Sequence, residues 1–210
     1  EDIEGPRFAE IWNLVFTQYD RQDGGKLVPL AAKNIDTGMG LERLACVMQG
    51  KKSNFEIDIF APINQSVRAS LRETKQSPRD KEQIYAISDH VRAVSFAIAD
   101  GVIPSNEGRG YVIRKLIRRA LWRAHRLTGE LRDPFLFKVV PVVVEVMKPA
   151  YPDLPSAEAH IRHTLEGEER RFLDTLEMGS GILENRLAQL KKKGAKIIPG
   201  ETVFELYDTY

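Results

Sequence analysis

A basic amphipathic segment, Pro104–Arg126, constrains the fold of this chain more than any other stretch of its sequence. Placed on a helix at about 100° per residue, Tyr111–Leu127 separates into two faces. The apolar face carries Ile113, Leu116, Ile117, Ala120, Leu121, Ala124 and Leu127. The opposite face carries Arg114, Lys115, Arg118, Arg119, Arg123, His125 and Arg126, together with Tyr111 and Trp122. The segment therefore predicts a helix that packs on a hydrophobic core and presents its cations outward.

Two interpretations of this cationic face are open from the sequence. Between Pro104 and Arg132 there are eight Lys and Arg residues against Glu107 and Glu130, a local charge of about +6. Carboxylates do not recur one turn from the cations, as they do on salt-bridged surface helices. Guanidinium groups interleaved with aromatic rings suit a nucleic-acid backbone, so the face predicts contact with RNA or DNA. The alternative is a solvated face whose cations pair with acidic side chains elsewhere in the fold.

The composition is that of a soluble globular protein, with 210 residues, 42% hydrophobic and 29% charged, and a net charge of +1. Cys46 is the only cysteine, which excludes a disulfide framework and a cysteine-based metal site and predicts a cytoplasmic location. The longest apolar run, Val139–Met147, is far shorter than the roughly 20 residues of a membrane helix, so no membrane partner is expected. The chain begins at Glu1 without a methionine, and we expect it to be part of a longer protein.

The first part of the chain predicts an antiparallel sheet with a helix against it. The expected elements are a strand at Ala9–Gln18, a hairpin connection at Asp23–Gly25, returning strands at Lys26–Leu30 and Lys33–Asp36, a glycine-rich turn, and a helix at Leu41–Met48 stopped by Gly50. From Asp58 onward the patterns are helical. The expected helices are Ile59–Leu71 capped by Asp58, Val91–Ala99 capped by Ser88 or Asp89, the basic helix closed by Thr128 and Gly129, and Ser156–Leu190, with a loop at Lys75–Arg79.

Two segments of the helical part are less regular. Val139–Val146 is rich in valine, which favours a strand, but its neighbours are helical and we predict a helix with Pro141 in its first turn. In the last segment, Glu201–Tyr210, apolar side chains are expected to pin the chain end to the core. The apolar residues of the long helix are expected to form a seam: Ile161, Leu165, Phe172, Leu176, Gly179, Leu183, Leu187 and Leu190. The predicted fold class is α+β, with domains at residues 1–57 and 58–210.

A G-x-G-x-x-R motif lies where the last predicted strand meets the first helix. Gly38 and Gly40 would let the backbone pass close to a flat or phosphorylated ligand, and a helix N-terminus favours negative charge. Arg43 could clamp a phosphate and Asp36 could hold an ammonium group. The alternative is a tight turn followed by a surface pair of Glu42 and Arg43.

Five segments, taken in order, carry a specific resemblance that covers nearly the whole chain. They are EIWNLVF (Glu10–Phe16), NIDTGMGLERL (Asn34–Leu44), SDHVRA (Ser88–Ala93), IADGVIPSNEGRGYVIRKLIRRA (Ile98–Ala120) and LYDTY (Leu206–Tyr210). In this order they resemble the alanyl-tRNA synthetases, a family of class II aminoacyl-tRNA synthetases. The resemblance implies the C-terminal part of a class II antiparallel sheet, with the third signature motif at Gly38–Arg43. It also implies a mainly helical domain that reads the acceptor stem of alanine tRNA.

The resemblance also assigns roles to individual residues. It implies that alanine and ATP, the latter with Mg²⁺, are bound by Trp12, Asn13, Asp36, Gly38, Gly40 and Arg43. Within this set, Asp36 would take the α-amino group of alanine and Arg43 the γ-phosphate of ATP, both as catalytic residues. It further implies tRNA contacts by Asn106 and Asp208 at a G·U wobble pair, and backbone contacts by Arg109, Arg114, Arg118 and Arg119. Asn106 could instead cap the basic helix, Asp208 could be a turn residue, and Asn13 could satisfy its own strand.

Several parts of the resembled family have no counterpart in this sequence. We find neither of the other two class II motifs, nor the editing domain with its zinc ligands, nor the C-terminal oligomerisation region. His160 and His163 lack a third ligand and are predicted to be surface residues, so no metal site is expected. We therefore expect this piece to be inactive as an enzyme on its own. The alternative functions are a non-catalytic tRNA-binding module of the same family and a helical domain that binds acidic proteins.

Overall fold

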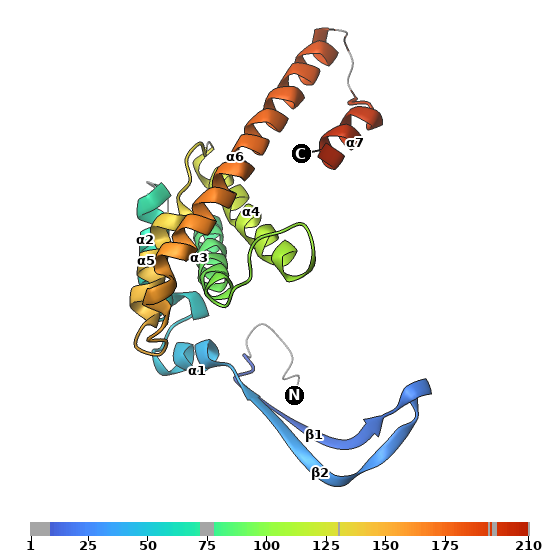
Figure 1. Ribbon diagram of the computed structural model, residues 1–210, viewed down its shortest axis with the longest axis vertical. Helices are drawn as coiled ribbons and strands as arrows, with labels where there is room; N and C mark the ends of the chain where they lie inside the picture. The colour runs from blue at the N-terminus through green and yellow to red at the C-terminus, as the bar shows by residue number, and fades with distance from the viewer. Residues whose placement is uncertain (1–8, 72–77, 130, 193, 195–196, 210) are drawn as a thin grey trace. The chain divides into compact units, whose positions relative to one another are not determined.

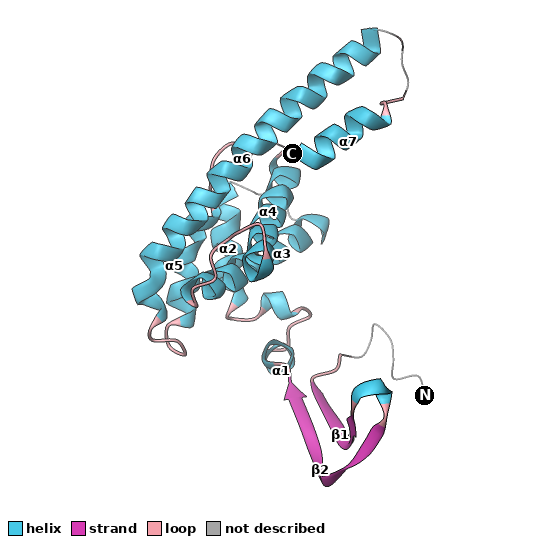
Figure 2. Cartoon of the chain, turned by 45° about the vertical axis from the view of Figure 1, so that its right-hand side comes forward, coloured by secondary structure: helices cyan, strands magenta, loops and turns pink. Residues whose placement is uncertain are grey.

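A β-hairpin followed by a series of helices makes up the chain, which confirms the predicted α+β class (Figures 1 and 2). The computed structural model describes residues 9–71, 78–129, 131–192, 194 and 197–209, the last five by their backbone. The elements are β1 (Trp12–Arg21), η1 (Asp23–Gly25), β2 (Leu27–Met39), α1 (Leu41–Met48), η2 (Asn54–Glu56), α2 (Phe60–Leu71), α3 (Pro78–Ala99), α4 (Gly108–Thr128), α5 (Leu136–Met147), α6 (Leu154–Lys192) and α7 (Gly200–Thr209). The chain divides into two units, Glu1–Ala61 and Pro62–Tyr210.

In the first unit, β1 and β2 pair in antiparallel register and are joined by the predicted Asp23–Gly25 connection. Gly24 and Gly25 have φ of 75° and 81°, which glycine adopts without the cost a Cβ brings. The expected glycine-rich turn after the second strand is wrong, because β2 is one continuous strand that runs through Gly38 to Met39. Helix α1 starts directly at Leu41 and ends at Met48, as predicted.

The expected helix against the sheet is also wrong. Helix α1 packs on η2, where Cys46 forms a small core with Ile57 and Phe60. Most side chains of β1 and β2 are exposed within this unit. The physical reason is that two strands cannot enclose an apolar layer between them, so the apolar residues of α1 use the nearest buried turn instead.

In the second unit, helices α3, α4, α5 and α6 pack on one another around the main hydrophobic core, to which α2 also contributes. The predicted apolar face of α4 is confirmed, with Leu116 partly buried and the others buried: Ile113, Ile117, Ala120, Leu121, Ala124 and Leu127. Full burial of an aliphatic side chain of this size stabilises a fold by roughly 1.5–3 kcal/mol. This face therefore anchors α4 and orients its cationic side away from the core.

Helix α3 is longer than the helix predicted from the sequence. It begins at Pro78, so Ser88 and Asp89 lie inside the helix and the predicted cap at these residues is wrong. The part of the predicted loop at Lys75–Arg79 that the structure describes, from Pro78, already belongs to this helix. The reason is a buried apolar stripe at alternating spacings of three and four residues, which continues upstream of the predicted start: Ile84, Ile87, Val91, Val94 and Ile98.

Helix α5 confirms the helical prediction for the valine-rich segment. It starts at Leu136, so Pro141 lies in its second turn and not in the first. The start is set by Glu169 of α6, whose carboxylate accepts hydrogen bonds from three backbone N–H groups: Phe135 at 2.8 Å, Leu136 at 2.8 Å and Phe137 at 3.0 Å. The first N–H groups of a helix have no partner within the helix. A carboxylate contributed by another helix satisfies them here.

The long helix is confirmed as α6, and the residues of the predicted seam are all buried or half-buried. Full burial ends at Leu173, and the leucines of the seam beyond it are half-buried: Leu176, Leu183, Leu187 and Leu190. In α7, Val203 is 52% exposed and Phe204 is 67% exposed, so these two side chains do not pin the chain end to the core. The side chains of Leu206, Tyr207 and Asp208 lie outside the described part of the chain. Among the described helices, none combines the length and apolar character needed to cross a membrane.

Candidate nucleic-acid interface

The turn before α4 places Asn106 beside the helix. Glu107 occupies the N-cap position and makes no side-chain capping bond, so Asn106 is not the cap. The Ser105 hydroxyl donates to the Glu107 carbonyl at 2.9 Å. A Cβ at Gly110 would overlap Ser105 Oγ and the carbonyl oxygen of Ile103. Only glycine at position 110 therefore allows this turn to fold closely back on the first turn of α4.

A groove of about 500 Å³ runs along the cationic face of α4. Its lining residues are Asn106, Tyr111, Arg114, Lys115, Arg118, Arg119 and Trp122. The structure thus brings together four of the six residues to which the family resemblance assigned tRNA contacts. Arg109 is exposed in the first turn of α4 and does not line the groove. Asp208 belongs to α7, and because its side chain is not described, its place relative to the groove stays a prediction.

Three lining residues were on the predicted cationic face but were not assigned a binding role. Tyr111, Lys115 and Trp122 recur at helical spacing along the same side of α4, and this periodicity could have identified them. Lys115 Nζ lies 5.8 Å from the centre of the Tyr111 ring, and Trp122 stacks on His125 with ring centres 5.5 Å apart. Both aromatic residues of the groove are about half exposed, so each offers a ring face or edge to a ligand.

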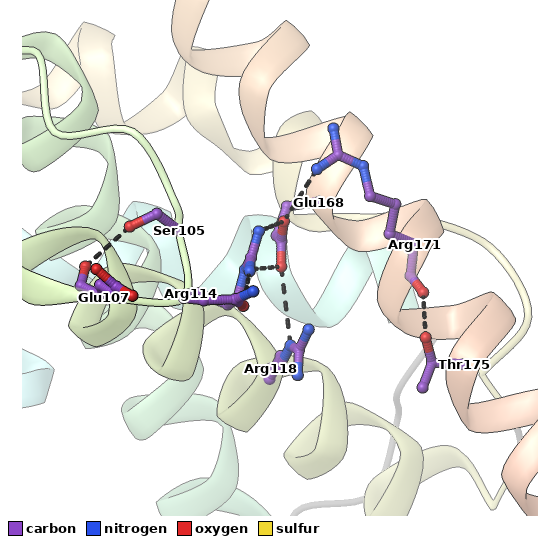
Figure 3. A network of polar contacts seen from close by, with 8 residues as sticks. Ser105, Glu107, Arg114, Arg118, Glu168, Arg171 and Thr175 are labelled. Carbon is purple, nitrogen blue, oxygen red and sulfur yellow. Dashed lines mark hydrogen bonds and ion pairs between the residues drawn. The ribbon is translucent and has the colours of Figure 1, made fainter. Parts of the chain in front are cut away.

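A buried carboxylate lies beside two of the arginines that line the groove, as Figure 3 shows for Glu168, Arg114 and Arg118. Glu168 of α6 is within 2.8 Å of Arg114 Nε and 3.7 Å of Arg118 Nε, both measured from its Oε1. Its Oε2 accepts a hydrogen bond from Arg114 Nη2 at 3.2 Å and lies 3.6 Å from Arg171 Nη1. The second interpretation of the cationic face is therefore partly correct, since two of the cations pair with an acid from another helix.

Other cations of α4 stay available for a ligand. Arg109, Arg119 and Arg126 are exposed, and none of them has a partner among the described residues. Arg123 is held through a hydrogen bond from its Nη1 to Gln83 Oε1 at 2.7 Å. The groove itself has four cationic side chains against one nearby carboxylate, so its charge is positive. A concave, cationic surface with exposed rings can bind a phosphate backbone and stack against nucleotides.

The residues implied to bind alanine and ATP lie in the first unit. In the β1–β2 register, Asn13 is opposite Gly38 and Val15 is opposite Asp36. Residues directly opposite each other share a face of the sheet, as do residues two apart along a strand. Asn13, Asp36 and Gly38 therefore share one face, and a Cβ at Gly38 would meet no atom within 4 Å. Trp12 is on the other face, where its indole Nε1 donates to the Thr37 hydroxyl.

Arg43 is placed by the junction between β2 and α1. Gly40 N–H donates to the Ile11 carbonyl at 3.0 Å, which ties the start of α1 to the chain entering β1. Arg43 Nη1 donates to the Glu10 carbonyl at 2.6 Å, and its aliphatic part lies against the position that a Cβ on Gly40 would occupy. Gly40 thus leaves room for the arginine to fold back along the backbone, with its guanidinium at the end of the hairpin.

Within the described part of the chain, no cluster of three or more His, Cys, Asp or Glu side chains could hold a metal ion. His160 and His163 are exposed on α6, and Cys46 is a buried free thiol.

Comparison with known proteins identifies the protein family of this chain. The family model for class II (A) tRNA synthetases matches residues 1–210, and the chain belongs to that family. Its curated relatives are alanine–tRNA ligases: the chain is 46% identical over 207 residues to that of Cupriavidus necator and 48% over 209 residues to that of Stenotrophomonas maltophilia. It is 45% identical over 208 residues to the alanine–tRNA ligase of Bacillus pumilus. The matches cover 99–100% of this chain but only 23–24% of each relative's length.

Proposed function

We propose that this chain acts within an alanine–tRNA ligase, with residues 1–57 in the aminoacylation domain and residues 58–210 reading the tRNA acceptor stem. The observation that carries the proposal is the cationic groove on α4, which brings Asn106 together with Arg114, Arg118 and Arg119. The named relatives support alanine as the amino acid. We further propose that the ligand of the groove is the acceptor stem, that its G·U pair is the feature recognised, and that ATP is the second substrate.

The groove suits the geometry of a double-stranded RNA end. Arg119 and Lys115 are exposed and can contact phosphates, which position an RNA without reading its sequence. Asn106 lies at one end of the groove and offers an amide, the group needed for hydrogen bonds to base edges. Base edges of an RNA helix are accessible mainly from its wide, shallow groove. We propose that Asn106, from the turn before α4, and Asp208, from α7, contact one wobble pair, while the arginines hold the backbone.

The face of the β1–β2 hairpin that carries Asn13, Asp36 and Gly38 is the proposed amino acid site. Asp36 is exposed and can pair with the α-amino group of alanine, and the bare backbone at Gly38 leaves room for the substrate beside Asn13. In alanine activation the substrate carboxylate attacks the α-phosphate of ATP, forming alanyl-adenylate and releasing pyrophosphate. Such a displacement depends on alignment and on neutralising the phosphate charges. We propose that Arg43 exchanges its bond to the Glu10 carbonyl for the γ-phosphate, with Mg²⁺ entering as part of the nucleotide substrate.

Substitutions at the residues proposed to contact RNA should distinguish recognition of the base pair from binding of the RNA backbone. Asn106→Ala and Asp208→Ala should each erase the preference for a G·U acceptor stem over a G·C one, because both remove a group assigned to base edges. Arg118→Ala should weaken both stems alike and lower the slope of log affinity against log salt by about 1. Fluorescence anisotropy with two RNA minihelices that differ only at this pair would measure both effects. Equal weakening of both stems by the alanine variants at 106 and 208 would contradict the base-reading roles.

A second experiment distinguishes a ligase segment from a tRNA-binding module without catalysis. The chain would be mixed with a polypeptide that carries the first and second class II motifs, and alanine-dependent exchange between ATP and pyrophosphate would be assayed. Exchange above that of either component supports the ligase role. Binding of tRNA without exchange supports the module, and binding of acidic proteins that tRNA does not compete away supports a protein-interaction domain.

A further inference from the structure

We propose that Glu168 of α6 is a positioning residue for RNA recognition, which orients Arg114 and Arg118 and, through Arg114, the amide of Asn106. The inference rests on the proposed acceptor-stem function and assigns part of its specificity to a side chain on another helix. Glu168 does not line the groove, and any effect it has on RNA must act through the side chains that do.

Burial and ion pairs hold the Glu168 side chain in one position. Its side chain is 3% exposed, whereas the side chains of Arg114 and Arg118 are 15% and 40% exposed. Both carboxylate oxygens face arginines: Oε1 is near Arg114 and Arg118, and Oε2 is near Arg114 and Arg171 (Figure 3). A buried carboxylate is strongly driven to keep its ion pairs, because an unpaired charge there is costly. The partly exposed arginines are therefore held in single orientations instead of sampling many in water.

Arg114 passes this constraint to Asn106. One nitrogen of its guanidinium group, Nη2, bonds to Glu168 Oε2 and another, Nη1, donates to Asn106 Oδ1. A guanidinium has only donors, so Asn106 must turn its carbonyl oxygen toward Arg114. Its NH₂ group is then left for a ligand. The chain of contacts Glu168–Arg114–Asn106 thus decides which end of the amide is available to an RNA base.

The neighbouring residues of α6 show that this contact differs from general packing. Glu169, the next residue, is also buried but bonds to the backbone at the start of α5. Phe172, one turn further, lies under Arg118, whose Cζ is 5.4 Å from the ring centre. One side of α6 therefore supports α5, and the adjacent side supports the arginines of α4 by an ion pair and a ring contact.

Glu168→Gln in the 210-residue chain tests the proposal, with Glu158→Gln as the matched control. Both remove one negative charge from α6, but Glu158 pairs with Arg162 and does not line the groove. We expect Glu168→Gln to lower the G·U over G·C preference by about tenfold, the scale of coupling within a contact network. Its affinity for the G·C stem should be equal or higher, because the charge beside the groove becomes more positive. Glu158→Gln should leave the preference unchanged.

A double variant checks that the effect passes through the amide. Asn106→Ala should lower affinity for the G·U stem less in the Glu168→Gln background than in the unsubstituted chain, because both changes disable the same chain of contacts. Arg114→Lys should also lose the preference, since a lysine can reach Glu168 but cannot bridge to Asn106 as a planar fork does. If Glu168→Gln keeps the preference that the unsubstituted chain shows, or weakens both stems equally, the positioning role is wrong.

A measurement without RNA keeps this inference separate from the proposed function. The ¹⁵Nε–H signals of Arg114 and Arg118 should be protected from exchange with water in the free chain. They should lose that protection in Glu168→Gln and retain it in Glu158→Gln. If the unsubstituted chain shows no G·U preference, the recognition proposal fails while the arginine signals still decide whether Glu168 orients these side chains. Signals that do not respond to Glu168→Gln would overturn the inference whatever the RNA result.

Discussion

Replacing Glu169 by alanine should lower the free energy of unfolding by about 3 kcal/mol at about pH 5, because three buried N–H groups lose their acceptor. The carboxyl group is fully buried, and its oxygens accept hydrogen bonds from the N–H groups of Phe135, Leu136 and Phe137 at the start of α5. An alanine leaves these donors unsatisfied and adds a cavity where the side chain was. Urea denaturation followed by circular dichroism would measure the loss.

Glu158→Ala is the matched control for this prediction. Its side chain is 31% exposed and pairs with Arg162 at 3.8 Å, one turn along the same helix. Exposed pairs of this kind contribute little, so the control should change stability by less than about 0.5 kcal/mol. Equal effects of the two substitutions would show that the backbone at the start of α5 finds other partners.

The same residue should make stability depend on pH. Burial raises the pKa of Glu169 from 4.5 to about 7, although the three N–H groups act in the opposite direction. Because the folded chain holds this proton more tightly than the unfolded chain, the stabilisation is complete below pH 4.5 and is lost as pH rises to about 7. The shift corresponds to about 3 kcal/mol. The stability difference between the unsubstituted chain and Glu169→Gln should fall by this order across that window, and a flat difference would contradict the shift.

Gly110→Ala should destabilise the second unit by about 2 kcal/mol, as overpacking of a buried site does. The added Cβ would overlap Ser105 Oγ and the Ile103 carbonyl, so the turn that carries Asn106 must move away from α4. The bond between Arg114 and Asn106 would then be broken, and the G·U preference of the chain should be lost together with the stability. Thermal unfolding and minihelix binding would measure the two effects.

Gly181→Ala provides the comparison for this second substitution. Gly181 lies inside α6, and a Cβ there would meet nothing within 4 Å. Alanine is favoured over glycine inside a helix by about 1 kcal/mol, so this substitution should leave stability equal or higher. If Gly110→Ala were as harmless as Gly181→Ala, the close fit between the turn and α4 would not govern the position of Asn106.

Local patterns in the sequence were sufficient to predict the bounds and the buried face of individual helices. The two faces of α4 follow directly from its spacing, and the structure buries the apolar side as predicted. Helix α1 has its predicted bounds, Leu41–Met48, and α4 ends at Thr128, where Gly129 adopts a φ of 76°. These features depend on side chains within one or two turns of each other, which is the range over which periodicity and capping act.

The start of α3 predicted from capping residues was wrong, because burial of apolar side chains stabilises a longer helix by more than a cap contributes. Ser88 and Asp89 are typical helix starts, yet the apolar stripe through Ile84 and Ile87 carries α3 upstream past both. Ser88 is fully buried inside the helix. A cap contributes about 1 kcal/mol, whereas two buried isoleucines contribute more, so the longer helix is the more stable arrangement.

By itself, the sequence determined the helical register of α4, the charge of its outer face and membership of the class II tRNA synthetase family. Only the tertiary structure decided what Glu168 and Glu169 do. They are adjacent and chemically identical, yet one pairs with arginines of α4 and the other binds the backbone at the start of α5. Their partners are 54 and 34 residues away along the chain. No local pattern encodes such contacts, because they exist only once α4, α5 and α6 have packed together and enclosed both carboxylates.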